Sequence, residues 1–121
     1  MMWLASCFPA AQATDPLIEG PTVLAWVELR PMPEKPELIE IIGRAQGIGP
    51  ASGRYALEVR RGGRGGSSNN RQEGQFKVVP GEAATLSRTT INFPEGSRIE
   101  AVLTLHVDGQ PITSATIKGG F

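Results

Sequence analysis

The sequence has few of the residues on which catalytic and metal sites are built. Among its 121 residues there is one cysteine, Cys7, and one histidine, His106. A zinc or iron site needs several histidine, cysteine or carboxylate ligands that converge, and no such spacing occurs. The Gly-x-Ser-x-Gly turn of many hydrolases is missing as well. The sequence therefore predicts no metal, no cofactor and no enzymatic activity.

Long apolar runs are also missing. No stretch approaches the roughly 20 apolar residues of a membrane-spanning helix. The 15 glycines and 10 prolines favour turns over long helices. An apolar content of 40% still supports a folded core, and the length fits one domain. What is left is a single domain built mainly from strands and turns.

The first 13 residues differ from the rest of the chain because they carry no charge. They end in Ala11-Gln12-Ala13, which is typical of the cleavage site of a secretory signal peptide. The segment is short and lacks a basic start, so we interpret residues 1–13 as the remnant of such a peptide. Residues 14–121 would then form the mature domain, without a cysteine. A lipoprotein cleavage box at Leu4-Ala5-Ser6-Cys7 is the alternative.

Beyond this segment, apolar and polar residues alternate with the period of a β-strand. The clearest alternation precedes Asp108-Gly109, a dipeptide that favours a two-residue hairpin turn. Gly43 and a slip of the apolar phase near residues 88–90 predict bulges. The expected strands are Thr22–Arg30, Glu37–Ala45, Arg54–Arg60, Gln75–Val79, Ala84–Phe93, Arg98–Val107 and Gln110–Lys118.

Seven short strands separated by turns predict an all-β fold, an immunoglobulin-like antiparallel β-sandwich. A small barrel is the alternative. The cysteine pair of antibody domains is missing, so the core must hold without a disulfide. We expect the large side chain of Trp26 to lie in that core rather than on a binding surface.

The stretch Gly53–Phe76 is expected to form a central hairpin with a glycine- and serine-rich tip. Residues 41–77 hold seven basic and two acidic residues, a net charge of +5, whereas residues 1–40 have a net charge of −4. Such a field steers acidic or polar partners, although a solvated arginine surface without a partner is the alternative. Arg61–Gly66 resembles the Arg-Gly-Gly repeats of RNA-binding tails. No aromatic residues accompany it, so we expect no nucleic-acid partner.

A family resemblance covers roughly residues 55–117. The runs that carry it are Tyr55–Val59, Gly65–Asn69, Gln72–Phe76, Leu86-Ser87, Ala101–Leu105, Asp108-Gly109 and the closing strand. They resemble the CsgH proteins of alphaproteobacterial curli systems, which are related in fold and function to the enterobacterial CsgC. The resemblance implies a periplasmic immunoglobulin-like domain, without enzymatic activity, that keeps the secreted curli subunit from polymerising into amyloid. CsgC carries a Cys-x-Cys pair that this domain lacks, so no redox role is carried over.

The resemblance implies that the partner is the amyloid-forming curli subunit, and we expect the domain to bind it as a monomer. Strand alternation places basic residues of the central hairpin on one solvent face and at its tip. These candidate partner-binding residues are Arg54, Arg60, Arg71 and Lys77 on the face, with Arg61 and Arg64 at the tip. In an alternative mode, the client would pair with an edge strand at Gln110–Lys118.

Two other function classes stay open from the sequence. A generic periplasmic binding or adhesion module would expose aromatic residues, for which Trp26 and Tyr55 are the candidates. A hydrolase on a sandwich scaffold would place His106 beside an acid in a deep pocket, as part of a triad assembled from distant residues. Neither class has a positive motif in the sequence.

Overall fold

The computed structural model describes residues 22–63 and 66–120, and this part of the chain folds into strands and contains no helix. It therefore offers no helix that is long and apolar enough to cross a membrane. The expected signal-peptide remnant at residues 1–13 lies outside the described residues. The strands are β1 (Val23–Pro31), β2 (Leu38–Gly47), β3 (Ala51–Gly63), β4 (Ser68–Val78), β5 (Ala83–Asn92), β6 (Ser97–Val107) and β7 (Gln110–Gly120).

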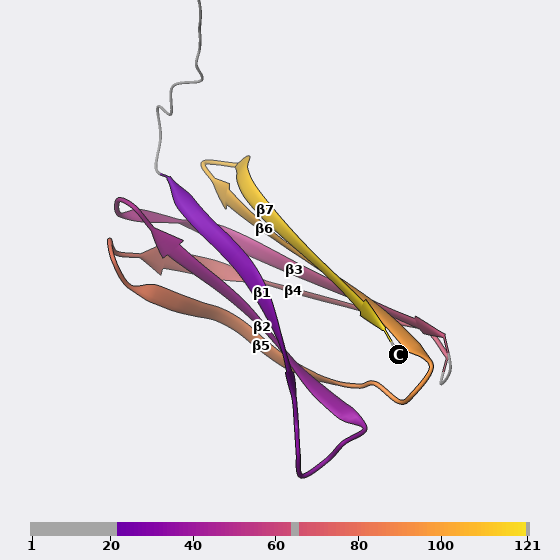
Figure 1. Cartoon of the computed structure of the whole chain (residues 1–121). Helices are drawn as coiled ribbons and strands as arrows, with labels where there is room; N and C mark the ends of the chain where they lie inside the picture. The colour runs from indigo at the N-terminus through magenta and orange to yellow at the C-terminus, as the bar shows by residue number, and fades with distance from the viewer. Residues whose placement is uncertain (1–21, 64–65, 121) are drawn as a thin grey trace, which may run out of the picture.

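These strands form two antiparallel sheets that pack face to face (Figure 1). One sheet has three strands in the order β1-β2-β5, and the other has four in the order β4-β3-β6-β7. The predicted antiparallel β-sandwich is confirmed, and the barrel alternative is wrong because the two sheets are separate. In constant-type antibody domains the fourth strand joins the sheet of the first two strands. Here β4 pairs with β3 instead, which makes the second sheet wider.

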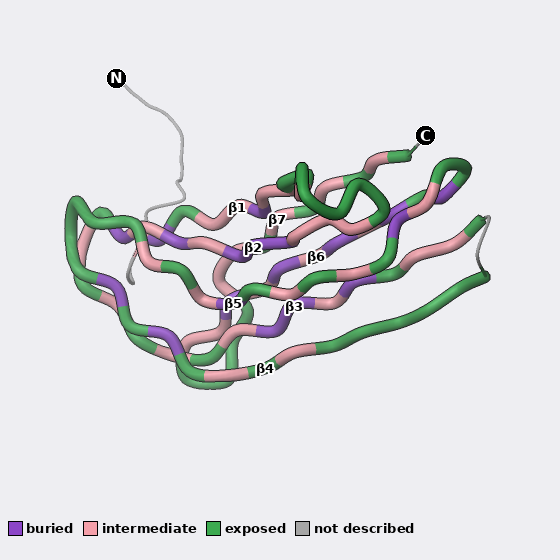
Figure 2. The backbone as a smooth tube through the Cα atoms, turned by 90° about the horizontal axis from the view of Figure 1, so that it is seen from below, coloured by how far each residue is buried: buried purple, intermediate pink, exposed green. Residues whose placement is uncertain are grey.

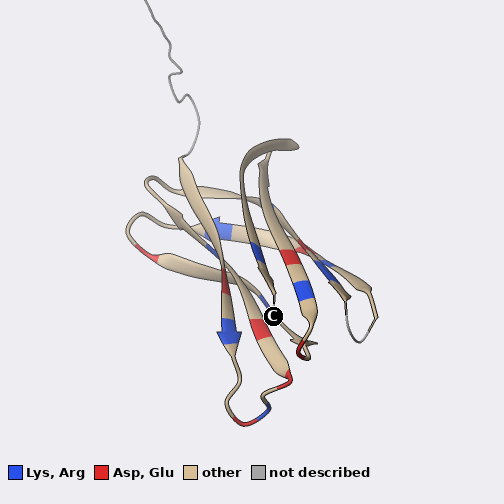
Figure 3. Cartoon of the chain, turned by 45° about the vertical axis from the view of Figure 1, so that its right-hand side comes forward, with Lys and Arg blue, Asp and Glu red and all other residues tan. Residues whose placement is uncertain are grey.

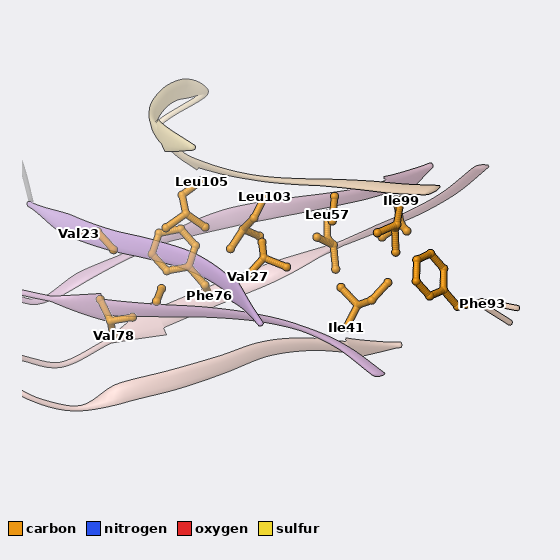
Figure 4. Close-up of a cluster of buried hydrophobic side chains, with 13 residues drawn as sticks. Val23, Val27, Ile41, Leu57, Phe76, Val78, Phe93, Ile99, Leu103 and Leu105 are labelled. Atoms are coloured by element: carbon orange, nitrogen blue, oxygen red, sulfur yellow. The ribbon is translucent and has the colours of Figure 1, made fainter. Parts of the chain in front are cut away.

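The core fills the space between the sheets with one phase of each strand. Leu57, Leu103 and Leu105 are fully buried on the four-stranded side, and Ile41 is fully buried on the three-stranded side. Figure 4 shows these side chains pointing toward one another, and Figure 2 shows buried and exposed residues alternating along the strands. Burial of each large aliphatic side chain is worth about 1.5–3 kcal/mol, so this cluster holds the sandwich together without a disulfide.

Strand β1 turns the side chain of Trp26 away from the core, which differs from the prediction. Val23 and Val27 are buried, whereas Leu24 is 54% exposed. Trp26 shares the outer phase with Leu24 and lies opposite Arg44 of β2. The expectation that Trp26 belongs to the core is therefore wrong. Because both phases of this strand are apolar, the spacing alone did not decide which phase turns inward.

The two predicted bulges merge into one irregularity between β2 and β5. The register shifts between Gly43 and Arg44, which pair with Ser87 and Thr85, so Leu86 is left without a partner. The phase slip in β5 is thus real, but it occurs at Leu86 rather than at residues 88–90. The extra residue belongs to β5 and not to β2. Gly43 faces the core, since a Cβ there would lie 3.5 Å from both methyl groups of Leu103, an ordinary packing distance.

The hairpin turn between β6 and β7 forms as predicted. Asp108 and Gly109 both have positive φ, at 53° and 77°, which is the backbone of a type I′ turn. Val107 and Gln110 pair directly on either side of it. Further along, Leu105 pairs with Thr113 and His106 with Pro111, which leaves one extra residue in β7.

The central hairpin is much longer than the sequence predicts. Strand β3 extends to Gly63, and β4 already begins at Ser68. The segment Ser68–Gly74, interpreted from the sequence as loop, pairs in regular register with β3. Its serine, asparagine and glycine residues are common in turns and rare in strands. Pairing with β3 therefore overrides the local preference of this segment.

Candidate functional site

The register of the central hairpin gathers four of the predicted binding residues on one surface. Leu57 and Val59 of β3 face the core, so the residues between them face outward. Cross-strand partners share a face of the sheet. Arg54 pairs with Gln75, Glu58 with Arg71, Arg60 with Asn69, and Ser52 with Lys77. Hence Arg54, Arg60, Arg71 and Lys77 all lie on the outer surface of the four-stranded sheet, and each of them is exposed.

Acidic neighbours neutralise only one of these four cations. Nε of Arg71 donates a hydrogen bond to Oε2 of Glu73 at 2.6 Å. This bond, the charge of Glu73 and a smaller contribution from Glu58 raise the pKa of Arg71, and Arg71 in turn lowers the pKa of Glu73. Among the described residues, no carboxylate lies within 4.0 Å of the basic groups of Arg54, Arg60 or Lys77.

The two residues expected at the hairpin tip do not join this surface. Arg61 lies within β3 and pairs with Ile99, a core residue, so its side chain starts on the inner side of the sheet. Its Nε donates to Oγ of Ser68 at 3.4 Å, and its Nη1 is buried without a hydrogen-bond partner in the described structure. Arg64 lies outside the described residues.

Two basic residues that the sequence analysis did not select extend the surface across β6 and β7. Arg98 lies opposite Gly62, and a Cβ on that glycine would lie 3.7 Å from Nη2 of Arg98. Lys118 lies opposite Glu100, with Nζ 3.8 Å from Oε2. Together with Arg60 they line an open hollow of about 410 Å³. Both residues are on the polar phase of their strands, but only the pairing of β3, β6 and β7 brings them beside Arg60.

We call this outer surface of the four-stranded sheet, which carries Arg54, Arg60, Lys77 and Arg98, the cationic face. Acidic positions are interleaved with the basic ones along the strands (Figure 3). None of these four arginine and lysine side chains has an ion-pair partner among the described residues. The face therefore has positive groups available to a partner, surrounded by small and polar side chains.

A second hollow, of about 460 Å³, lies on the same face and contains His106. Glu73 and Asp108 also line it, but no serine, threonine or cysteine does. Glu73 is bound to Arg71. A nucleophile–histidine–acid triad is therefore not assembled in this hollow. Residues 22–63 and 66–120 also contain no group of three or more His, Cys, Asp or Glu side chains able to hold a metal ion.

On the outer surface of the three-stranded sheet, the charged side chains pair with one another. Glu28 accepts a hydrogen bond from Nε1 of Trp26 at 2.9 Å, and its carboxylate lies 3.3 Å from Arg30 and 3.5 Å from Arg44. The Trp26 hydrogen bond, followed by the charges of Arg44 and Arg30, lowers the pKa of Glu28 against the opposing effect of burial. The guanidinium carbon of Arg44 lies 5.8 Å from the centre of the Trp26 ring.

A further ion pair on that surface joins Arg88 to Glu40 at 3.3 Å. We call this surface, with Trp26, Glu28, Arg44, Glu40 and Arg88, the paired face. The indole ring of Trp26 is half-buried, with Arg44 over the ring and Glu28 bound to its N–H. Tyr55 packs against the core and is half-buried. Neither aromatic residue supplies the exposed platform that an adhesion module would need.

Comparison with known proteins agrees with this architecture. The sequence model of the family described as "CsgH protein" matches residues 39–116, which is more than half of the chain. The solution structure of R. palustris CsgH is similar with a TM-score of 0.64 and 20% sequence identity, covering 79% of this chain and 91% of that one. The structure of the E. coli curli protein CsgC is similar with a TM-score of 0.59 and 18% identity, covering 78% of this chain and 97% of that one.

A search of curated protein sequences finds no match to this chain. At 20% and 18% identity, the two structural similarities establish the fold alone. The family match is independent of them and covers β2 from Ile39 through most of β7. The resemblance found in the central hairpin and in β6 falls inside this range. The chain belongs to the CsgH family.

Proposed function

We propose that this protein is a periplasmic chaperone-like inhibitor of amyloid polymerisation by the curli subunit. The observation that carries the proposal is the cationic face of a CsgH-family domain. Four of its basic side chains, Arg54, Arg60, Lys77 and Arg98, come from neighbouring strands and have no carboxylate partner among the described residues. The association of the family with curli proteins supports the choice of client, and the signal-like residues 1–13 support the location.

The proposed mechanism is transient capture of the unfolded subunit. An amyloid precursor exposes an extended backbone and polar side chains that stack into cross-β ladders. Arg54, Arg60 and Lys77 offer charge-assisted hydrogen bonds to carboxylates, side-chain amides and backbone carbonyls of such a chain. Capture on this face keeps the segment away from other copies of the subunit.

The expected strength of this contact fits a transient role. An exposed ion pair contributes about 0–1 kcal/mol. Four such contacts add up to at most about 4 kcal/mol, which corresponds to a dissociation constant of about 1 mM. Weak contacts of this kind form and break quickly, so one domain is able to meet many subunits. Inhibition below an equimolar ratio is therefore expected.

The proposed function is tested by a thioflavin-T time course of purified curli subunit, with and without this domain at well below equimolar ratio. A strongly lengthened lag is the expected result. An unchanged curve, with the domain shown to be folded by circular dichroism, would reject the proposal. The domain should also run as a monomer in sedimentation experiments, since the mechanism uses one copy at a time.

A further inference from the structure

Four strands lie at the borders of the two sheets, and they differ in how they are protected against pairing with another chain. Borders are β1 and β5 in one sheet, and β4 and β7 in the other. Proteins protect such borders with prolines, bulges or covering segments. Strand β7 has Pro111 and an extra residue, and β1 packs against it. Strand β5 has the extra residue Leu86, and β1 ends with Pro31.

Strand β4 has none of these devices. It pairs with β3 through all of its 11 residues without a register shift, and it contains no proline. Its second half is tied to the sandwich, because Phe76 and Val78 are buried and Gln72 is hydrogen-bonded to Ser87 of β5. Its first half, Ser68–Arg71, is exposed at every position, as Figure 2 shows in green near the label β4.

The register identifies which backbone groups of β4 are free. The type I′ turn makes Val107 and Gln110 a hydrogen-bonded pair. The backbone N–H and C=O groups of successive residues point to opposite sides of a strand. Those of odd-numbered residues in β6 therefore point to β7, and those of even-numbered residues point to β3. Arg54 pairs with His106, so even-numbered residues of β3 bond to β6 and odd-numbered ones to β4. Val59 pairs with Asn70. The N–H and C=O groups of Asn69 and Arg71 therefore point away from β3, along the open border.

We propose that the client binds as an added strand on this border of β4, along Ser68–Arg71. The occupant is an extended polypeptide segment rich in glutamine and asparagine, because another extended backbone matches a row of outward N–H and C=O groups and replaces the water that otherwise binds them. The side chains of Ser68, Asn69 and Asn70 suit polar neighbours, since amide side chains form ladders between adjacent strands. Apolar segments would gain no burial there.

The added strand would lie directly beside the cationic face. Asn69 and Arg71 of β4 would be the direct neighbours of the client's side chains on the outer surface, and Arg60, which pairs with Asn69, lies one strand further in. A strand inside a cross-β fibril uses both of its edges. A client strand that spends one edge on β4 cannot be stacked on both sides. This inference rests on the proposed function and gives it a specific binding mode.

The test substitutes proline at positions whose N–H points away from the sheet. Asn69→Pro removes one outward donor on β4 and leaves every bond to β3 in place, as an edge strand tolerates. Asn69→Ala is the matched control, because it changes the side chain and keeps the N–H. Ser114→Pro is the equivalent change on β7, where Ser114 lies opposite Thr104 and also points outward. Thioflavin-T lag times of curli subunit are compared at equal doses of folded domain.

The expected result is that Asn69→Pro loses most of the added lag. Asn69→Ala should lose only the smaller part that the side-chain amide contributes, and Ser114→Pro should keep the wild-type lag. Wild-type inhibition together with undiminished inhibition by folded Asn69→Pro would overturn the β4 mode and leave the proposed function standing. Failure of the wild-type domain to lengthen the lag would reject the proposed function itself. If the wild type sediments as a dimer that Asn69→Pro makes monomeric without loss of inhibition, the border pairs two copies and the proposal is overturned.

Amide hydrogen exchange keeps the proposal falsifiable if Asn69→Pro does not fold. In the isolated wild-type domain, the amides of Asn69 and Arg71 should exchange fast, whereas that of Asn70, bonded to β3, should be protected. On adding freshly unfolded curli subunit, the Asn69 and Arg71 amides should slow. Unchanged exchange at both amides, under conditions where the subunit is inhibited, would overturn the proposal.

Discussion

The two outer faces of the sandwich carry arginines in different electrostatic settings. On the paired face, Glu28 accepts a hydrogen bond from Trp26 and forms ion pairs with Arg30 and Arg44. On the cationic face, Arg54, Arg60 and Lys77 have no carboxylate partner within 4.0 Å in the described structure. Charges that already satisfy one another have little left to offer a ligand, whereas unpaired ones are available to a partner. The same residue type is thus paired on one face and left without a carboxylate partner on the other, and the proposed function uses the second face for binding.

The largest expected effect comes from a substitution in the hydrophobic core, on which both faces depend. Leu103 is fully buried between the sheets and lies close to Gly43 of the opposite sheet. Leu103→Ala should lower the free energy of unfolding by about 2–5 kcal/mol, because it leaves a cavity in the core. Thr104→Ala, one residue further and on the outer phase, should change stability by less than about 0.5 kcal/mol. Urea unfolding followed by circular dichroism measures both, and equal losses would contradict the assignment of the core.

A second expected effect is the dependence of inhibition on salt concentration. If the cationic face captures the client by charge, inhibition should weaken as the ionic strength rises. The Debye length falls from about 30 Å at 0.01 M to about 3 Å at 1 M. The lag added by the domain is measured at each salt concentration relative to the subunit alone. Inhibition that does not change across this range would remove charge as the basis of capture.

A smaller effect of opposite sign is expected when a competing acid is removed. Glu73→Gln ends the ion pair with Arg71 and adds a free guanidinium to the cationic face. Inhibition should become stronger at the same dose. Glu40→Gln, which releases Arg88 on the paired face, is the matched control and should leave the lag unchanged. Equal effects of the two substitutions would mean that the location of the freed charge does not matter.

The smallest effect concerns the pH dependence of the paired face. The hydrogen bond from Trp26 and the charges of Arg44 and Arg30 lower the pKa of Glu28 below its usual value of 4.5. A lowered folded-state pKa contributes stability above the unfolded value, and this contribution is lost as the pH falls through the folded value. The Glu28→Gln variant has no carboxylate to protonate at this position. Its free energy of unfolding should therefore fall less than that of the wild type when the pH is lowered below 4.5. Identical pH profiles of the unfolding midpoint would contradict this role of Glu28.

Alternation and turn signals predicted most of the fold because they act locally. The phase of β6 and the Asp108-Gly109 turn are set within a few residues, and both are confirmed. Local patterns failed where distant partners decide the structure. Ser68–Gly74 has the composition of a loop but is a strand because β3 lies beside it. Trp26 sits on the outer surface because the competing phase of β1 meets the core.

The candidate site was only partly predictable for the same reason. Arg54, Arg60 and Lys77 share a surface because the hairpin pairs in a register that alternation within the predicted strands already suggests. Arg71 shares it because Ser68–Gly74, expected as loop, pairs with β3 in the same register. Arg98 joins them only through the pairing of β3 with β6, which no local pattern encodes. The neutralisation of Arg71 by Glu73 depends on side-chain positions two residues apart on one strand. Sequence spacing allows that contact but does not require it.

The most direct test removes three positive charges from one face or from the other and compares the inhibition by the two variants. One variant carries Arg54→Ser, Arg60→Ser and Lys77→Ser, and the other carries Arg30→Ser, Arg44→Ser and Arg88→Ser. Thioflavin-T lag times of curli subunit are measured with equal doses of each folded variant. The first variant should lose most of the inhibition at nearly wild-type stability, and the second should be less stable but inhibit like the wild type. Equal inhibition by both variants would contradict the assignment of binding to the cationic face.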